Sequence, residues 1–303
     1  MTKKSYFSKK IKMNTVSEIL SYITEVAPIH WQESYDNSGL LVGNANALVD
    51  KVLLTLDLTE KVIDEAIENS FHLVISHHPL IFKGLKNILM DDTTGRIITK
   101  AIKHDISIAA MHTNIDNSFY GVNRVLAEQL GLKDLQILRS QQSVVSGQCS
   151  ASASASASAS ESESESESVS VSEFQVGSGM VGVLENEMSE NDFLKLIKEK
   201  LNVGAIRYSE LLDKPIKKVA ICGGSGAFLI NDAKRCGADA YVTADLKYHD
   251  FFDADNEILV LDAGHFETEQ FTKQLFADII LKKNPKFAVQ ISRVNTNSVN
   301  YFV

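Results

Sequence analysis

Residues 52–79 read VLLTLDLTEKVIDEAIENSFHLVISHHP, a pattern typical of a strand, a helix and a second strand. The apolar run Val52–Leu56 is rich in leucine and predicts a buried strand. Thr59 then precedes a segment whose apolar residues recur at helical spacing, which predicts an amphipathic helix. The short apolar run Leu73–Ser76 predicts the second strand. A strand, a helix and a strand in this order indicate an α/β protein.

The same alternation of apolar runs and amphipathic segments continues along the chain. Apolar strands of this kind are buried on both faces, so we predict sheets covered by helices on both sides. Further strands are predicted over 106–111, 219–222, 241–243 and 258–261, and further helices over 97–102, 122–130, 191–201, 227–236 and 267–282.

A low-complexity repeat interrupts this pattern between Ser150 and Ser172, where every second residue is serine. Its small and acidic side chains bury too little apolar surface to offset the entropy of ordering the backbone. We therefore predict a solvated linker, with a silk-like or partner-bound strand as the alternative. The predicted division of the chain is a basic leader over 1–12, a first α/β lobe over 13–140, the linker over 141–173 and a second α/β region over 174–303.

The composition is that of an acidic globular protein. Its 303 residues include 30 Lys+Arg and 39 Asp+Glu, a net charge of −9, which argues against nucleic acid or an anionic membrane as the main partner. The longest apolar runs are far shorter than the roughly 20 residues that a membrane-spanning helix needs. The three cysteines have no CxxC spacing, so neither a disulfide framework nor a cysteine zinc site is indicated. We expect a cytoplasmic protein.

Histidines and carboxylates follow three of the predicted strands. In open α/β sheets, ligands bind beyond the carboxyl ends of the strands, so these residues are candidates for a binding site. A single histidine at such a position is usually structural, but three endings of this kind favour a metal centre. The residues are His77 and His78 after the first run, His112 and Asp116 after the second, and His265 and Glu269 after the third.

The geometry at these strand ends suits metal binding. Adjacent residues in a strand point to opposite faces, so His77 and His78 share a cavity only where the strand ends, and Pro79 supplies that ending. Two neighbouring imidazoles arranged in this way suit two metal ions better than one. His265 and Glu269 lie four residues apart, which places both on one face of a helix.

The chemistry of the donors narrows the choice of metal. Imidazole nitrogen with carboxylate oxygen, and no thiolate, fits Zn, Fe, Mn, Co or Ni. His112 and Asp116 share a face if their segment is helical. The ring of His112 could equally donate a hydrogen bond to a carboxylate ligand instead of binding a metal itself.

Two loops and two aromatic residues allow more than one interpretation. The turn Asp36–Gly39 could simply reverse the chain or could brace a pocket. The glycine-rich segment Gly223–Gly226 could bind a phosphate through its backbone N–H groups, but a tight strand-to-helix turn is favoured because the spacing matches no phosphate-binding motif. Phe174 and Phe228 could form a platform on which bases stack, but they are expected in the core.

Several motifs together resemble one known family, the dinuclear-metal proteins called GTP cyclohydrolase 1 type 2-like or Ngg-interacting factor three-like. They occur in the family's order and cover nearly the whole chain apart from the leader and the repeat. The motifs are Tyr35–Gly43, Ser76–Pro79, His112–Asp116, Thr243–Asp245 and Asp262–His265 with Glu269.

The resemblance implies a fold of two similar three-layer α/β lobes that face a metal-containing cleft. It also implies a toroidal homohexamer whose metal sites face an internal cavity. By this resemblance His112 belongs behind the ligands, as a hydrogen-bonding partner. Two divalent ions, with one carboxylate shared between them, are implied at His77, His78, Asp116, His265 and Glu269.

The chain differs from the family's long form, in which a small α/β domain is inserted between the lobes. Here the serine-rich repeat occupies that junction. Functions of the inserted domain, such as control of access to the cavity, are therefore not expected of this chain.

The sequence leads to one main functional hypothesis and one alternative. The main hypothesis is a metal-dependent hydrolase that acts on a nucleotide or a related heterocycle through a hydroxide bridging the two ions. Other dinuclear hydrolases, such as a phosphoesterase, differ from this only in substrate. The alternative is a non-catalytic metal-binding or regulatory scaffold, also oligomeric.

Overall fold

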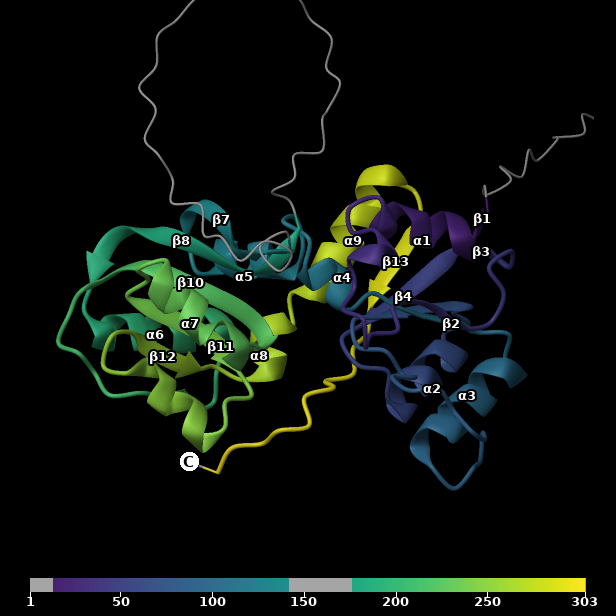
Figure 1. Ribbon diagram of the computed structural model, residues 1–303. Helices are drawn as coiled ribbons and strands as arrows, with labels where there is room; N and C mark the ends of the chain where they lie inside the picture. Colours follow the sequence, from purple (N-terminus) through teal and green to yellow (C-terminus); the bar gives the residue numbers. More distant parts are fainter. Residues whose placement is uncertain (1–12, 142–175, 303) are drawn as a thin grey trace, which may run out of the picture.

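The computed structural model describes residues 13–141 and 176–302, so the basic leader, the serine-rich repeat and Phe174 lie outside the described residues. Most strands belong to two sheets (Figure 1). Five strands form the first sheet, in the spatial order β13 (Ala288–Ile291), β4 (Lys51–Thr55), β5 (Leu73–Ser76), β6 (Ser107–Ala110) and β2 (Gly39–Val42). Two short strands, β1 (Asn14–Thr15) and β3 (Leu48–Val49), pair separately.

The first sheet is the middle of three layers. Helices α1 (Val16–Thr24) and α9 (Thr272–Lys283) cover one face, and α2 (Glu60–Glu68) and α3 (Thr93–Lys103) cover the other. The strand residues alternate between these faces. Val52 and Leu54 pack on the side of α1 and α9, and Leu53 packs on the side of α2 and α3. The apolar run predicted as a buried strand therefore has core on both sides.

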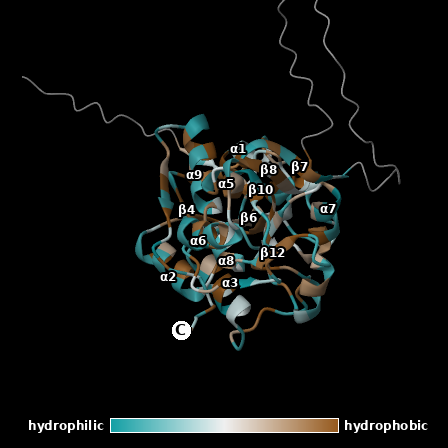
Figure 2. Ribbon diagram, turned by 90° about the vertical axis from the view of Figure 1, so that its left-hand side faces the viewer, coloured by the Kyte–Doolittle hydropathy of each residue, from teal (hydrophilic) through white to brown (hydrophobic). Residues whose placement is uncertain are grey.

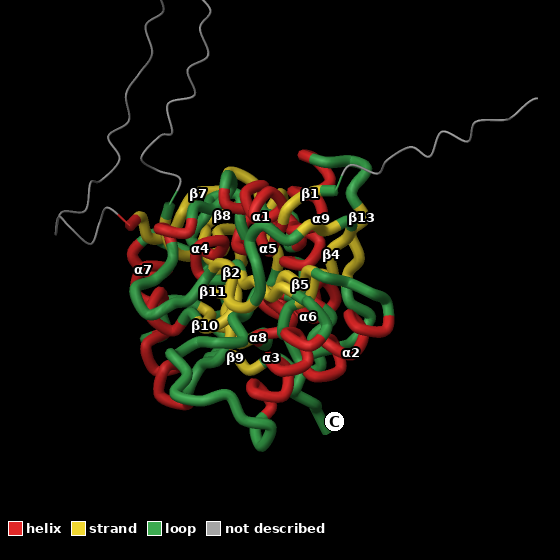
Figure 3. The backbone as a smooth tube through the Cα atoms, turned by 90° about the vertical axis from the view of Figure 1, so that its right-hand side faces the viewer, coloured by secondary structure: helices red, strands yellow, loops and turns green. Residues whose placement is uncertain are grey.

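The second sheet is built in the same way from later residues. Its strands lie in the order β7 (Lys133–Ser140), β8 (Gly177–Met188), β10 (Ile216–Ser225), β11 (Ala240–Ala244), β12 (Leu259–Asp262) and β9 (Arg207–Tyr208). Helices α5 (Val122–Gln129) and α6 (Glu190–Leu201) pack on one face, and α7 (Ile230–Arg235) packs on the other. Figures 2 and 3 show hydrophobic strands inside and helices outside. The predicted α/β fold is confirmed.

The chain returns to the first sheet near its C-terminus. After β12 it forms α8 (His265–Glu269), then α9 on the first sheet, and then β13, which pairs in parallel with β4. The prediction of a single helix over 267–282 is therefore wrong. Its residues form two helices because α8 lies against the second sheet and α9 packs on the first. The predicted second region, 174–303, thus includes a strand of the first sheet.

The local sequence signals explain several boundaries. Thr59 caps α2, because its side chain accepts a hydrogen bond from the Val62 N–H. Phe228 does not lie in the core as expected, since it is 54% exposed. Among the helices of the described residues, none has the length and apolar character needed to cross a bilayer.

Candidate metal centre

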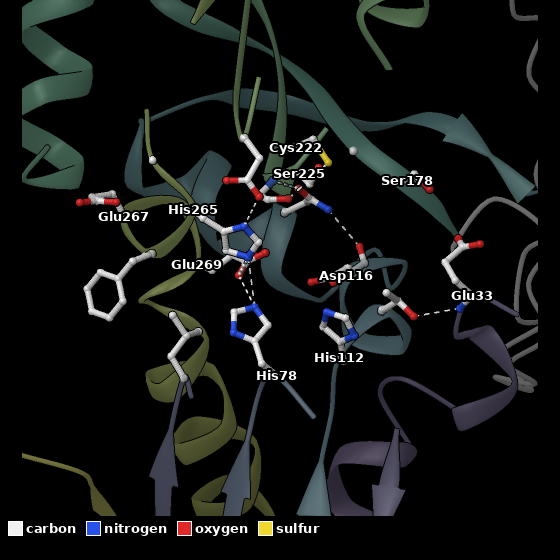
Figure 4. Close-up of a pocket in the computed structure, with 18 of the residues that line it drawn as sticks. Glu33, His78, His112, Asp116, Ser178, Cys222, Ser225, His265, Glu267 and Glu269 are labelled. Carbon is white, nitrogen blue, oxygen red and sulfur yellow. Dashed lines mark hydrogen bonds and ion pairs between the residues drawn. The ribbon is translucent and has the colours of Figure 1, made fainter. Parts of the chain in front are cut away.

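The ends of strands from both sheets bring the candidate ligands together. His77 and His78 follow β5, and its parallel neighbour β6 leads through His112 into helix α4 (Thr113–Asp116). His265 and Glu269 are the first and last residues of α8, which follows β12 in the second sheet. Figure 4 shows His78 and His265 approaching from opposite sides, with Glu269 beside them.

Three ligand atoms converge between the two sheets. The Nε2 atoms of His78 and His265 lie 3.1 Å apart, and each lies 3.0 Å from Oε2 of Glu269. The carboxylate side chain is only 4% exposed, so water does little to separate these groups. Such close approach of atoms that carry lone pairs requires a proton or a cation between them.

His77, Asp116 and Glu269 form a second group of converging ligand atoms. The Nε2 atom of His77 lies 3.6 Å from both Asp116 Oδ1 and Glu269 Oε2, and the His77 side chain is fully buried. This nitrogen has no hydrogen-bond partner among the described residues. Buried polar atoms are nearly always paired, so an unpaired nitrogen facing two carboxylates is explained best by an ion.

All four histidines of the cluster are oriented in the same way. In each case an oxygen lies within hydrogen-bonding distance of Nδ1, which therefore donates the ring proton and leaves the Nε2 lone pair facing the other ligands. The Nδ1 atoms of His77, His78, His112 and His265 donate to the Met111 carbonyl (2.8 Å), Asp57 (2.7 Å), Asp36 (2.8 Å) and Asp245 (2.7 Å), respectively.

The supporting carboxylates make the two outer imidazoles strongly basic. Burial opposes protonation of His78, but hydrogen bonds to Asp57 and Glu269 outweigh it and raise the pKa to about 9. Burial likewise opposes protonation of His265, but Asp245 and Glu269 raise its pKa to about 11. A divalent cation would be attracted by the same negative charges and would compete with the protons for these nitrogens.

Burial also affects the pKa values of the three buried groups, His77, Asp116 and Glu269. Burial lowers the pKa of the His77 imidazole, which favours its neutral form. Burial and the nearby Glu269 carboxylate raise the pKa of Asp116 well above its usual range. Burial also disfavours the ionised form of Glu269, but the surrounding histidines hold its pKa well below its usual range. Of the two carboxyl groups that face His77, Glu269 is therefore the one that favours the ionised form.

The residues present fit a metal centre. Each of three overlapping groups has its ligand atoms within 4.8 Å of one another, and Glu269 belongs to two of the groups. The structure thus brings all five predicted residues together, and His112 lies beside His77 and His78. The groups are His77, His78 and His112; His78, His265 and Glu269; and His77, Asp116 and Glu269.

The sequence prediction missed two of the supporting carboxylates as partners of the histidines. Asp57 accepts a hydrogen bond from Nδ1 of His78, and Asp245 accepts one from Nδ1 of His265. Both follow a predicted strand closely, so the rule that singled out the other three strand ends could have found them. The turn at Asp36 does brace the site, because its carboxylate accepts hydrogen bonds from the ring of His112 and from Thr113.

The glycine-rich segment at the end of β10 makes room for the centre. The N–H groups of Gly223 and Gly224 donate to the side chains of Asn123 (2.9 Å) and Thr268 (3.0 Å), so neither points freely toward a phosphate. Gly224 has a φ of +62°, and a Cβ atom there would overlap Oε1 of Glu269. Glycine therefore permits both the backbone conformation and the position of the carboxylate.

The candidate centre opens into a large cavity between the sheets. Its volume is about 1290 Å³, and His78, His112, Asp116, His265 and Glu269 lie on its wall. Aromatic and basic side chains complete the lining, among them Tyr35, Phe82, Arg139, Arg207, Phe228 and Tyr301. A small molecule can therefore reach the ligands.

Comparison with known proteins gives a consistent picture. The family described as Duf34/NIF3 (NGG1p interacting factor 3) matches residues 14–298. A protein of Clostridium perfringens named GTP cyclohydrolase 1 type 2 homolog is 36% identical over 255 residues, which cover 84% of this chain and 86% of the relative. A Staphylococcus epidermidis protein of the same name is 29% identical, and the match covers 94% of this chain and 99% of the relative.

The Staphylococcus epidermidis alignment spans 364 positions, more than the 303 residues of this chain, so that relative contains residues that this chain lacks.

Solved structures agree with the fold. A Bacillus cereus protein related to NIF3 is 29% identical with a TM-score of 0.80, covering 96% of this chain and 100% of its own. Staphylococcus aureus SA1388 is 30% identical with a TM-score of 0.79, covering 95% and 99%. This chain belongs to the Duf34/NIF3 family.

Proposed function

We propose that the protein is a hydrolase that uses two divalent ions and acts on a nucleotide or a related heterocycle. The observation that carries this proposal is the buried, unpaired Nε2 of His77 facing two carboxylates, beside the convergence of His78, His265 and Glu269. When bound, the two ions would supply Lewis acidity that lowers the pKa of water and polarises the bond under attack.

The chain's own residues would divide the work of holding the ions. Of the three groups, two contain Glu269: His78, His265 and Glu269 would hold one ion, and His77, Asp116 and Glu269 would hold the other. The carboxylate of Glu269 would therefore be shared. Asp57 and Asp245 fix the ring orientations of His78 and His265, so that the nitrogen lone pairs are directed before an ion arrives.

The cavity supports turnover over storage of metal alone. A scaffold needs no space for a substrate, whereas here the ligands open into about 1290 Å³. Tyr35 and Phe82 form one aromatic wall, with ring centroids 6.1 Å apart, and such a wall suits a flat heterocycle. The names of the curated relatives make GTP the first substrate to test.

The test combines metal analysis with an assay of GTP turnover. Purified protein loaded with Mn, Zn or Fe is expected to retain two ions per chain and to open the imidazole ring of GTP. His78→Ala is expected to abolish turnover while circular dichroism stays unchanged. His104→Ala is the matched control, because it removes an imidazole from the same lobe at the exposed end of α3.

The outcomes separate the hypotheses. Turnover that survives in His78→Ala would overturn the assignment of the site. Two bound ions without turnover of nucleotides, phosphoesters or amides would instead favour the non-catalytic scaffold. A homohexameric assembly and a cytoplasmic location are part of the same proposal, and mass photometry of the purified protein tests the assembly.

A further inference from the structure

The last described residues form a strap between the two sheets. This C-terminal strap, residues 292–302, leaves β13 in the first sheet and runs to the second sheet, where the yellow chain ends in Figure 1. Several of its residues line the cavity, including Thr296, Asn297 and Tyr301. The strap is therefore part of the wall of the candidate metal centre.

The strap is anchored to both sheets by specific contacts. At its start, Glu65 of α2 accepts hydrogen bonds from the Ser292 hydroxyl (2.5 Å) and from the Arg293 N–H (3.1 Å). Farther along, Asn297 donates to Glu267 of α8 (3.0 Å). These contacts give the residues between them a defined position.

At its far end the strap packs on the second half of the molecule. The ring of Tyr301 lies directly over Gly204, where a Cβ atom would overlap it. The absence of a side chain at Gly204 therefore lets the ring pack closely. The strap is held on both sides of the cavity, with Thr296 between its anchors.

Thr296 contacts the group that orients a candidate ligand. Its hydroxyl donates a hydrogen bond of 2.8 Å to Oδ2 of Asp57, and the other oxygen of Asp57 accepts a bond of 2.7 Å from Nδ1 of His78. Both carboxylate oxygens are thus engaged by defined donors. Rotation of the carboxylate would break at least one of the two bonds.

Asp57 needs such a restraint because water can reach it. Its side chain is 36% exposed, in contrast to the fully buried side chain of Asp36, which braces His112. A partly hydrated carboxylate can exchange its histidine partner for water unless a second contact holds it. The Thr296 hydroxyl supplies that contact within the described residues.

We propose that Thr296 is a positioning residue for the metal centre, which acts by holding Asp57 against His78. The inference rests on the metal site of the proposed function, and it assigns to the strap a role in metal affinity. Removing the hydroxyl frees the carboxylate and leaves the ring of His78 less well directed. We expect the loss of this hydrogen bond to the carboxylate to lower the affinity about fivefold, which corresponds to about 1 kcal/mol.

The experiment measures Co(II) binding to the full-length protein by absorption spectroscopy in competition with a chelator. Thr296→Val removes the hydroxyl and keeps the shape, whereas Thr296→Ser keeps the hydroxyl. We expect Thr296→Val to weaken Co(II) binding about fivefold and Thr296→Ser to restore the wild-type affinity. Asp57→Asn is expected to weaken binding about 10- to 100-fold, as for other outer-shell partners of metal ligands.

A double variant tests whether Thr296 acts through Asp57. If it does, Thr296→Val will have no further effect in the Asp57→Asn background. Asn297→Ala is the control for a general loosening of the strap, because it breaks the bond to Glu267 but leaves the Thr296 contact in place.

The results distinguish this inference from the function on which it rests. Wild-type affinity in Thr296→Val, equal losses in Thr296→Val and Asn297→Ala, or additive losses in the double variant would each overturn the role of Thr296. Failure of the wild-type protein to bind Co(II) would instead overturn the proposed metal function, and with it the basis of this inference.

Discussion

The two halves of the candidate metal centre differ in how they are built. The first-sheet half supplies three histidines and Asp116 from the ends of β5 and β6, within residues 77–116. The second-sheet half supplies only His265 and Glu269, from a helix of five residues. Yet Glu269 lies within 3.6 Å of the Nε2 atoms of His77, His78 and His265, so the smaller half holds the shared carboxylate.

This difference indicates how the centre is completed. Neighbouring parallel strands bring the first-sheet ligands together without help from the rest of the chain. The shared negative charge is added only when α8 packs between the sheets. Changes near Glu269 should therefore affect metal binding more than changes in the turns that support the first-sheet half.

The largest effect is expected from Glu269→Gln. The substitution removes the shared charge from two of the ligand groups, so we expect Co(II) affinity to fall by more than the roughly 10- to 100-fold typical of losing an outer-shell partner. Elemental analysis after gel filtration measures the ions retained. Glu267→Gln, on the same helix, should keep them, because its amide oxygen can still accept the hydrogen bond from Asn297. If Glu269→Gln retained two ions, the proposed difference between the two halves of the centre would be wrong.

A smaller effect is expected from Gly224→Ala. The added methyl would displace the Glu269 carboxylate and lie 3.2 Å from the ring of His265, so we expect Co(II) binding to weaken about 10-fold or more. Gly237→Ala separates this effect from backbone strain, because Gly237 also has a positive φ (+70°) but an added Cβ meets nothing within 4 Å. Both variants should lose about 1 to 2 kcal/mol of stability because of the positive φ, Gly224→Ala should lose more because of its overlap with Glu269, and only Gly224→Ala should lose metal affinity. Equal affinities in a Co(II) titration would contradict this.

A modest effect is expected from Asp36→Asn in the first-sheet half. His112 keeps one hydrogen-bond acceptor in this variant but loses the charge, so we expect metal-free protein to lose about 1 to 3 kcal/mol of unfolding free energy at neutral pH. Urea unfolding measures this, and Co(II) affinity should change less than in Gly224→Ala. Asp50→Asn, at an exposed position, is the control.

The same variant has a defined pH dependence. Burial opposes ionisation of Asp36, but hydrogen bonds from His112 and Thr113 outweigh it and hold its pKa well below the usual range. The ionised carboxylate therefore stabilises the fold above about pH 4, and this contribution is lost as the pH falls below that value. The wild-type protein should lose stability over that range, and Asp36→Asn should lose less. Parallel curves would show that Asp36 contributes nothing to acid sensitivity.

The smallest effect is expected from deleting residues 150–172. The chain leaves the second sheet at Ser140 and returns at Gly177, and these two residues pair in register between β7 and β8. The intervening residues therefore need not span any distance. Shortening them should change the unfolding free energy by about 1 kcal/mol or less and leave metal content unchanged. A large drop in the melting temperature would show that the repeat contributes to the stability of the second sheet, whose strands β7 and β8 it connects.

Sequence patterns predicted the buried strands better than the edge strands. β5, β6 and β12 are apolar runs, and the ligands that follow them could be found from that position alone. β7 and β13 carry polar residues because they lie at sheet edges, so their sequences lack a run that stands out.

Long-range packing accounts for what the patterns could not predict. The helical spacing continues from α8 into α9, and no local signal shows that the two helices pack on different sheets. The strand-end rule pointed to the ligands, but the pairing of Asp57 with Thr296, 239 positions away, depends on where the strap crosses. Contacts of this kind follow from the fold and not from spacing.

The pairing of β13 with β4 has a consequence for synthesis on the ribosome. More than 230 residues are synthesised after β4 before β13, one of its two neighbours in the sheet, is made. Helix α9, which covers part of the same core, is also made late. Until then the growing chain exposes an unpaired strand edge and an apolar face, the features that invite aggregation. The strands of the second sheet are all made by residue 262. The half of the protein that emerges first is therefore the last to be finished.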